Sequence, residues 1–491
     1  MRELGPPLPP STLVLVGAKW VSLGALLQRA FRLGAAILLA RLLVPGDFGV
    51  FAVVSVTIDA LSALKELGMP TALIRLRSGV HQAASTFFYL SITSAGAICS
   101  ATWIAAPQFA AFVGSPLVTP VMRAMVFKIA FESASIVQRT LAMRELSLRP
   151  VTQVALMEAA VGSSLSIVLA AGGFGVWSLV WGTLGGSAVS AIVWWRLSTW
   201  RPTGRPAPRV ARQLIGFGAN VSGSAVIEGA VEAVTRALVG RGQGVAGLGY
   251  LDLAVRMAVM PVRSLTVAVG QQVAVPAMCL VQRDLRRMAS WYLAALRALS
   301  AATAPLAACL VTLPDLLVIG IFGNQWAPAV PLVRLLGPAV FILPLTYARP
   351  VYVATGRVDL LLRLSLLQLT LATPAVYVAA RDGLEAVCVV QIGVFGVVAA
   401  VNIAVVRRLL GLGWDEILRA LRVPLEGAAV LALALVSLRA WLHPEPTLWW
   451  LAAVATPGLL AYAALMRLRQ PELVAGLLGA AKRASAPAVA D

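Results

Sequence analysis

Apolar runs of roughly 20 residues recur along the whole of this chain, and each is long enough to cross the hydrocarbon of a bilayer as a helix. In hydrocarbon every backbone N–H and C=O must be hydrogen-bonded within the protein, so only helices and closed barrels span it. The runs are rich in Leu, Ala and Val and lack the period-two alternation of a membrane barrel. Charged residues are 12% of the 491 residues and hydrophobic residues 59%. The sequence therefore predicts an all-α integral membrane protein.

The apolar runs predict about 14 transmembrane helices when a window of about 19 residues is used. Turns rich in Gly and Pro separate them, as at 45–47 and 202–208. The predicted spans lie at 13–40, 48–64, 85–106, 116–138, 150–171, 174–195, 213–240, 247–275, 289–313, 328–354, 360–380, 384–406, 424–442 and 447–466.

The basic residues predict how the chain is oriented. The chain carries 40 Lys and Arg against 21 Asp and Glu, a net charge of +19 that in a soluble protein would suggest nucleic acid. Here these residues lie between the apolar runs, where they act as topology signals and head-group contacts. If the N-terminus is cytoplasmic, the outer junctions hold only Arg41, Arg241, Arg381 and Arg439. We therefore expect both termini in the cytoplasm. The N-terminal ten residues do not resemble a cleavable signal, so the first span should be retained.

The longest basic junction, from Trp200 to Arg212, contains three prolines and divides the spans into six before and eight after. At an offset of 200 residues Arg41 meets Arg241, a match that either a duplicated unit or chance in apolar sequence explains. Transporters built from repeats usually bind their substrate at the repeat interface. We expect a six-helix lobe at 1–199, a cytoplasmic linker at 200–212, a second six-helix lobe at 213–410, two further helices and a cytoplasmic tail at 411–491, and a central cavity between the lobes.

Residues for covalent chemistry are scarce. The two histidines, His81 and His443, are far apart, and no zinc, nucleophile-elbow or phosphate-loop motif is present. The glycine groups at 172–175 and 240–244 predict turns at helix ends. The four cysteines lie in or beside apolar runs without metal-ligand spacing, and we interpret them as packing residues: Cys99, Cys279, Cys309 and Cys388. The sequence therefore predicts neither an enzyme nor a metal site.

Charges inside the apolar spans are the candidate functional residues, because burying one costs at least about 2.5–3.5 kcal/mol. Three spans carry the largest sets: Arg29 and Arg32 in the first; Glu228, Glu232 and Arg236 in the seventh; Asp252, Arg256 and Arg263 in the eighth. Smaller sets lie in the fourth, ninth and tenth spans: Arg123, Lys128 and Glu132, then Arg297, then Arg334.

Two interpretations of these charges are open. Residues three or four apart share a helical face, so the sets can point at one cavity. The same spacing also allows Glu232 to pair with Arg236, and Asp252 with Arg256, simply to hold the helices. Arg29, Arg32 and Arg263 have no nearby acid in sequence, which favours an anionic ligand. Arginine suits phosphate because its planar fork binds two oxygens and keeps its charge when desolvated. The hypothesis is a lipid substrate with a phosphate or diphosphate head.

The chain resembles the polysaccharide and O-antigen flippases of the multidrug/oligosaccharidyl-lipid/polysaccharide (MOP) exporter superfamily in several stretches: LARLLVPGDFGVFAVV at 39–54, DALSALKELGMPTALIR at 59–75, GLGYLDLAVRMAVMPVRSLTVAVGQQVAVPAMC at 247–279, LPDLLVIGIFGNQWAPAVPLVRLLGPAVFILPL at 313–345 and ATGRVDLLLRLSLLQL at 354–369. The resemblance implies two six-helix lobes around a cavity and alternating access. The implied cargo is an oligosaccharide repeat unit of an exopolysaccharide or O-antigen linked to undecaprenyl diphosphate, carried across the bacterial inner membrane.

The resemblance also implies roles for particular residues. By position, the substrate-binding residues are Arg29, Arg32, Arg256 and Arg263, and the residues for ion coupling or salt bridges are Glu228, Glu232, Arg236 and Asp252. Gly46, Gly49 and Pro70 are implied to be structural, setting a tight turn and helix ends. No cofactor is implied, only coupling to a proton or sodium gradient. The implied partners are the lipid-linked substrate, membrane lipids, a polysaccharide polymerase and export machinery, without nucleic acid, and the implied state is a monomer.

Two alternatives remain from the sequence. A multidrug exporter of the same fold would bind organic cations with acidic and aromatic residues, whereas the charges in these spans are net basic. A membrane glycosyltransferase or polymerase acting on lipid-linked sugars usually has a large outer loop. No predicted outer junction here exceeds about 15 residues, the length above which a loop usually has its own function.

Overall fold

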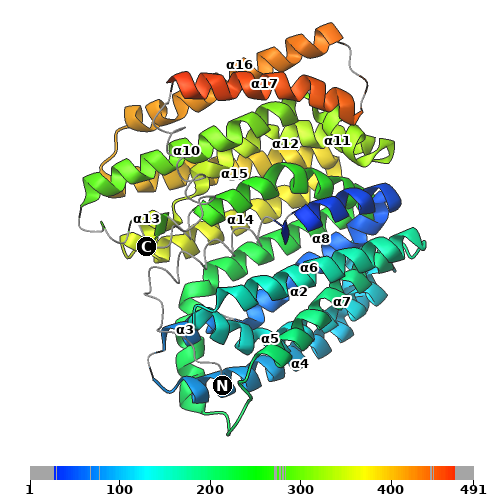
Figure 1. Cartoon of the computed structure of the whole chain (residues 1–491), viewed down its shortest axis with the longest axis vertical. Helices are drawn as coiled ribbons and strands as arrows, with labels where there is room; N and C mark the ends of the chain where they lie inside the picture. Colours follow the sequence, from blue (N-terminus) through cyan, green and yellow to red (C-terminus); the bar gives the residue numbers. More distant parts are fainter. Residues whose placement is uncertain are drawn as a thin grey trace, which may run out of the picture. The chain divides into compact units, whose positions relative to one another are not determined.

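The computed structural model of the chain describes residues 27–28, 30–66, 68–76, 78–269, 274–275, 278, 281, 284–442, 445 and 447–469. Within these ranges every regular element is a helix, as the sequence predicts. The chain forms two compact units, Met1–Ala237 and Leu238–Asp491 (Figure 1). The predicted division into lobes around a linker at 200–212 stays a prediction.

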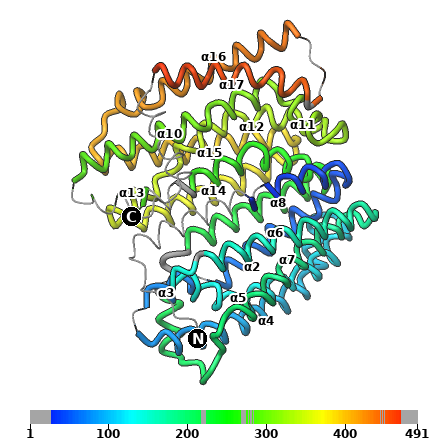
Figure 2. Tube along the Cα trace, viewed as in Figure 1, coloured from blue at the N-terminus to red at the C-terminus, as the bar shows by residue number. Residues whose placement is uncertain are grey.

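The first unit is a bundle of long helices in which α6 packs along α7, α4 along α5, and α5 along α7 (Figure 2). Small residues allow α6 and α7 to cross closely, since a Cβ added to Gly182 of α7 would lie 2.7 Å from the carbonyl oxygen of Gly162 of α6. The described elements of this unit are a helix over residues 30–42, α2 (Pro45–Glu66), α3 (Met69–Arg75), α4 (Val80–Val113), α5 (Val118–Arg144), α6 (Leu148–Ala171), α7 (Val176–Leu197) and the first part of α8 (Pro208–Val269), up to residue 237.

The motif at 45–49 starts α2 and ties it to α7. The Asp47 carboxylate is hydrogen-bonded to the backbone at Val176, the first residue of α7, and lies against Gly175. Gly175 has a positive φ of 54°, so a side chain there would be both strained and close to Asp47. Gly46 itself lies in the first turn of α2 with open space around it. The backbone N–H of Asp47 donates to the Val44 carbonyl oxygen at 3.0 Å and closes a tight turn that contains Gly46, as expected. Asp47 adds the contact of this motif with α7.

The second unit also consists of packed helices, with α10 against α12 and α16, α14 against α15, and α16 beside α17 (Figure 1). Gly242 of α8 contacts α14 so closely that an added Cβ would lie 2.3 Å from the carbonyl oxygen of Ala380. The described elements of this unit are the second part of α8, α10 (Leu285–Thr312), α11 (Pro314–Phe322), η2 (Asn324–Ala329), α12 (Val330–Ile342), η3 (Leu343–Thr346), α13 (Arg349–Ala354), α14 (Asp359–Asp382), α15 (Leu384–Leu410), α16 (Trp414–Leu442) and α17 (Leu448–Arg469).

Two predicted segments have a different form. The span predicted at 328–354 is discontinuous, because α12 tightens into the 3₁₀ turn η3 and the helix then breaks at Tyr347 before α13. Pro344 and Pro350 flank this break and supply no backbone N–H, which explains why the helix cannot continue. The junction predicted at 241–246 is instead helical apart from a kink at Gly244, whose φ of 71° only glycine adopts easily.

Eleven helices within the described ranges are long and apolar enough to cross a membrane. The difference from about 14 has three sources. Most of the span predicted at 13–40 lies outside the described residues. One candidate of 45 residues, Gly223–Val267, contains most of two predicted spans. Finally, α5 has 27 residues, about 40 Å of helix, but it is not among the eleven because it carries several charges. The count of fourteen stays a prediction.

Candidate functional site

In the first unit, helices α2 and α5 share a polar network inside otherwise apolar segments. Lys65 Nζ donates to Ser133 Oγ at 2.5 Å, and Ser62 Oγ donates to the Glu132 carboxylate at 3.0 Å. Lys128 is ion-paired with both Glu132 and Asp59. Lys65 is only 3% exposed, although the sequence suggests a topology charge at a helix end. Its position three residues after Ser62 is the signal that could have placed both on one face toward α5.

The acidic and basic residues of the first part of α8 are paired as their spacing suggests. Arg236 Nη2 lies 3.0 Å from Glu232 Oε1, and Arg236 is 5% exposed. Glu228, one turn earlier, is exposed and makes no hydrogen bond or ion pair with a described residue. The two carboxylates predicted for ion coupling in this part of α8 therefore differ in their partners. Glu232 is ion-paired with Arg236, whereas Glu228 has no partner among the described residues.

A second paired set lies in α8 within the other unit. Arg256 Nε donates to Asp252 Oδ2 at 2.5 Å; the Asp252 side chain is fully buried, whereas that of Arg256 is 39% exposed. The buried carboxylate therefore holds an arginine whose side chain is partly exposed. Arg263, two turns further along, is exposed. The expected pairing of Asp252 with Arg256 is thus present, and it does not exclude an additional anionic ligand of Arg256.

The arginines predicted in the first span are only partly described. Arg29 lies outside the described residues. Arg32 is exposed in the helix over residues 30–42 and has no hydrogen-bond or ion-pair partner in the described part of the chain. In the second unit Arg334 of α12 is likewise exposed, with no partner among the residues that the structure describes. Unpaired arginines on apolar helices are the features that an anionic ligand would complete.

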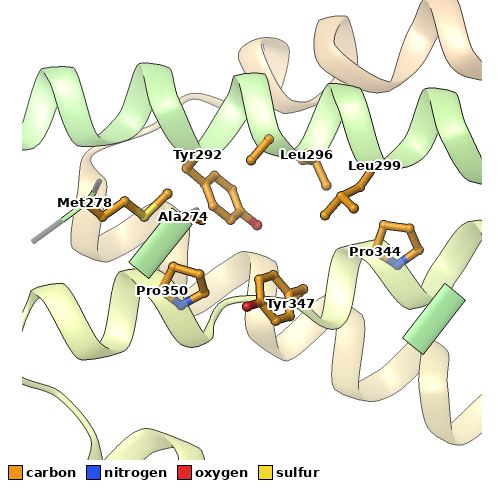
Figure 3. Close-up of a pocket in the computed structure, with 9 residues that line it drawn as sticks. Ala274, Met278, Tyr292, Leu296, Leu299, Pro344, Tyr347 and Pro350 are labelled. Atoms are coloured by element: carbon orange, nitrogen blue, oxygen red, sulfur yellow. The ribbon is translucent and has the colours of Figure 1, made fainter. Parts of the chain in front are cut away.

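A small pocket in the second unit has a different character. It lies between α10 and the broken segment η3–α13 (Figure 3). The lining is largely apolar, and the hydroxyls of Tyr292 and Tyr347 lie in it. Neither hydroxyl has a hydrogen-bond partner among the described residues. None of the described residues that line this pocket is charged, so the pocket offers a diphosphate no cation among them.

No group of three or more His, Cys, Asp or Glu residues within the described ranges is placed to hold a metal ion. The cysteines at 99, 309 and 388 are free thiols in helices, and the Cys99 thiol donates to the carbonyl of Val126 at 3.5 Å. Cys279 lies outside the described residues. The helical charges are therefore the candidate functional groups of this chain.

The helical architecture is shared with transporters of known structure. Lipid II flippase MurJ in an inward closed conformation superposes with a TM-score of 0.74 and 13% identity, over 92% of this chain and 99% of that one. An inward-facing multidrug resistance MATE transporter of the MOP superfamily gives a TM-score of 0.63 and 17% identity, over 80% of this chain and 98% of that one. The fold is that of the MOP transporters.

Sequence comparison then defines the family. The polysaccharide biosynthesis protein family matches residues 38–331, more than half of the chain, and the chain belongs to this family. Succinoglycan biosynthesis transport protein ExoT of Rhizobium meliloti (strain 1021) is 26% identical over 353 residues, 70% of either chain. Lipopolysaccharide biosynthesis protein WzxC of Escherichia coli (strain K12) is 22% identical over 376 residues, 74% of this chain and 75% of that one.

These matches confirm the resemblance noted from the sequence. The chain is a multi-pass membrane transporter of polysaccharide biosynthesis with the MOP fold, and it is not an enzyme. The glycosyltransferase or polymerase alternative is therefore wrong.

Proposed function

We propose that this protein flips an oligosaccharide repeat unit linked to a polyprenyl diphosphate across the bacterial inner membrane by alternating access. The cargo would be a unit of an exopolysaccharide, an O-antigen or a similar polymer. The family and the two relatives in succinoglycan and lipopolysaccharide biosynthesis support this class of cargo. The cytoplasmic termini, the monomeric state and the partnership with a polymerase and export machinery belong to the same proposal.

The physical task divides the cargo into two parts. The prenyl tail can stay in the hydrocarbon, but each unpaired polar group of the sugar diphosphate would cost several kcal/mol there. The protein must therefore give the head group a polar path and cations that match its negative charge. Arginine meets the second need, because its N–H groups bind phosphate oxygens in two places at once.

Arg32 is exposed and has no hydrogen-bond or ion-pair partner among the described residues, and this observation carries the assignment of an anionic cargo. We assign Arg29, Arg32, Arg256 and Arg263 to the diphosphate, as the resemblance implies. The partly exposed side chain of Arg256, which the buried carboxylate of Asp252 holds in place, supports its inclusion. Arg263 is exposed on the same helix.

The coupling carboxylate in this proposal is Glu228. Glu232 and Asp252 are held by arginines one turn away, whereas Glu228 is exposed and has no partner among the described residues. A carboxylate that is not neutralised by a neighbour can take up a proton or a sodium ion during a transport cycle. Arg236 then acts as the salt-bridge partner of Glu232 and helps to hold the helix.

The test replaces Arg32 or Arg263 by Ala in cells that make the surface polysaccharide. Losing a charge-assisted contact should weaken head-group binding roughly tenfold or more. We expect the surface polymer to fall sharply and lipid-linked repeat units to accumulate on the cytoplasmic side, with membrane levels of the protein unchanged. The matched control is Arg422→Ala, because this exposed arginine is already paired with Glu426. Normal export by both variants would refute the anion site.

The same cells distinguish the multidrug alternative. A drug exporter would lower the accumulation of an organic cation such as ethidium and would leave the surface polymer unaffected by its deletion. A polysaccharide flippase gives the opposite pattern.

A further inference from the structure

The segment that joins α7 to α8 is fixed against the first unit, although its composition suggests a loose spacer. Arg201 donates to the carbonyl oxygens of Ser198 at 2.6 Å, Trp200 at 2.8 Å and Trp195 at 2.9 Å. Its guanidinium also lies 5.3 Å from the centre of the Trp195 ring. These contacts satisfy carbonyl groups at the C-terminal end of α7 and hold the start of the segment in one conformation.

The remainder of the segment is attached to the start of α4. The backbone N–H of Thr203 donates to Ser85 Oγ at 3.3 Å, and that of Ala207 donates to Thr86 Oγ1 at 3.2 Å. The Trp200 ring packs edge-on against Phe88, with centroids 5.9 Å apart. We call residues 198–212 the pinned linker.

The charges of the pinned linker face outward. Arg205, Arg209 and Arg212 are exposed, and none makes an ion pair or hydrogen bond with a residue that the structure describes. Arg209 and Arg212 are three residues apart in the first turns of α8, so they share a helical face. Arg201, in contrast, donates its N–H groups to backbone carbonyl oxygens. The pinned linker thus holds three arginines in place, and no described residue neutralises their charge.

Apolar and aromatic residues precede these arginines in the chain. Ile192 and Leu197, at the C-terminal end of α7, are 54% and 53% exposed and offer apolar surface. The rings of Trp195 and Trp200 pack edge-on against Phe88, and tryptophan is enriched where a helix leaves the hydrocarbon. Arg144 of α5 donates to the carbonyl of Leu76, which places another arginine at the end of α3, in the chain just before α4 begins.

We propose that the pinned linker is a binding site for the phosphate head groups of anionic phospholipids, with Arg205, Arg209 and Arg212 as the contacting residues. Acyl chains lie against Ile192 and Leu197, and the phosphate lies at the level of the arginines. A basic residue near an anionic membrane surface contributes roughly a fivefold change in binding. Three of them together favour an anionic over a zwitterionic lipid by roughly a hundredfold. This proposal is independent of the cargo, because it concerns lipids that stay in the membrane.

The experiment is native mass spectrometry of the purified full chain after equilibration with phosphatidylglycerol or phosphatidylethanolamine. We expect the wild-type chain to retain phosphatidylglycerol in preference to phosphatidylethanolamine. The triple variant Arg205→Gln, Arg209→Gln, Arg212→Gln should lose most of that preference. Inorganic phosphate at constant ionic strength should not displace the lipid, because it has no acyl chains to bury.

The matched control is the double variant Arg419→Gln, Arg422→Gln in the second unit. It removes exposed arginines that already have protein partners, the carbonyl of Asp415 and the Glu426 carboxylate, and should retain phosphatidylglycerol normally. The proposal is overturned if the triple variant retains the lipid as well as the wild type, or if the control loses it equally. Displacement by inorganic phosphate would identify a free-anion site instead and would also overturn it.

Discussion

Two buried tyrosines of the second unit allow a sharp test of the packing, because one hydroxyl is hydrogen-bonded and the other is not. Tyr352 is 0% exposed and its hydroxyl donates to Asn402 Oδ1 at 2.9 Å. Tyr292 is 4% exposed and its hydroxyl has no hydrogen-bond partner among the described residues. Substitution of either by Phe removes a single oxygen atom and leaves the ring in place.

The two substitutions should differ in their effect on the free energy of unfolding. Tyr352→Phe leaves the Asn402 carbonyl buried and unpaired, at a cost of about 1–3 kcal/mol. Tyr292→Phe removes a hydroxyl that makes no bond to the described protein, so we expect a change within about 0.5 kcal/mol or a stabilisation. For a unit of this size, 1 kcal/mol corresponds to about 2–4 °C in Tm. Tyr352→Phe should therefore lower Tm by several degrees, and Tyr292→Phe should not.

The assay is thermal unfolding of the purified chain in detergent, followed by tryptophan fluorescence at one scan rate. Replacing Asn402 by Leu in the Tyr352→Phe background removes the unpaired carbonyl and should recover part of the loss, since removing both partners of a bond is less costly than removing one. Equal destabilisation by Tyr292→Phe and Tyr352→Phe would refute the reasoning. It would mean that the Tyr292 hydroxyl is hydrogen-bonded within the space shown in Figure 3.

Three further predictions address other contacts. Gly242→Ala forces a Cβ to within 2.3 Å of the Ala380 carbonyl oxygen and should destabilise the α8–α14 contact by about 1–3 kcal/mol, seen as a lower Tm; an unchanged Tm would show that the helices separate freely. Arg439 pairs with Asp315 through two bonds of 2.7 and 2.8 Å, so a double-mutant cycle of Ala substitutions should give a coupling energy of about 1 kcal/mol; additive effects would show that the pair contributes nothing. Glu228→Gln should abolish the dependence of transport in vesicles on an imposed proton or sodium gradient, whereas dependence equal to wild type would exclude this carboxylate from coupling.

The charged residues within the helices show how far the sequence could be followed. Pairs four residues apart on one helix, such as Glu232 with Arg236 and Asp252 with Arg256, were predictable because helical geometry fixes their proximity. The ion pair between Asp59 and Lys128 joins two helices, and the two residues are 69 positions apart in the chain. No local pattern states which face of α2 meets which face of α5. Hydrogen bonds and ion pairs between helices could therefore not be predicted from the sequence.

The positions of helix breaks within the predicted spans could not be predicted from the sequence either. Hydropathy located the segment at 328–354 correctly but not its break at Tyr347, since Pro338, Pro344 and Pro350 all lie within it and the helix continues through the first. Which proline ends a helix depends on whether neighbouring groups satisfy the backbone that it leaves unpaired. Asp47 was part of a recognisable motif, but its contact with α7 needed the folded unit.

The sequence by itself determined the solvent, the helical class and the transporter family. The first two follow from local properties, because apolar runs of about 20 residues suit hydrocarbon and can cross it only with their backbone groups paired, as in helices. The family follows from motifs that are contiguous in the chain. Tertiary structure decided which charges are neutralised, where the helices break, and that the basic linker is fixed on α4 with three arginines facing outward. Those features depend on contacts between residues that are distant in the chain, and the free energy of such contacts exists only once the helices have packed.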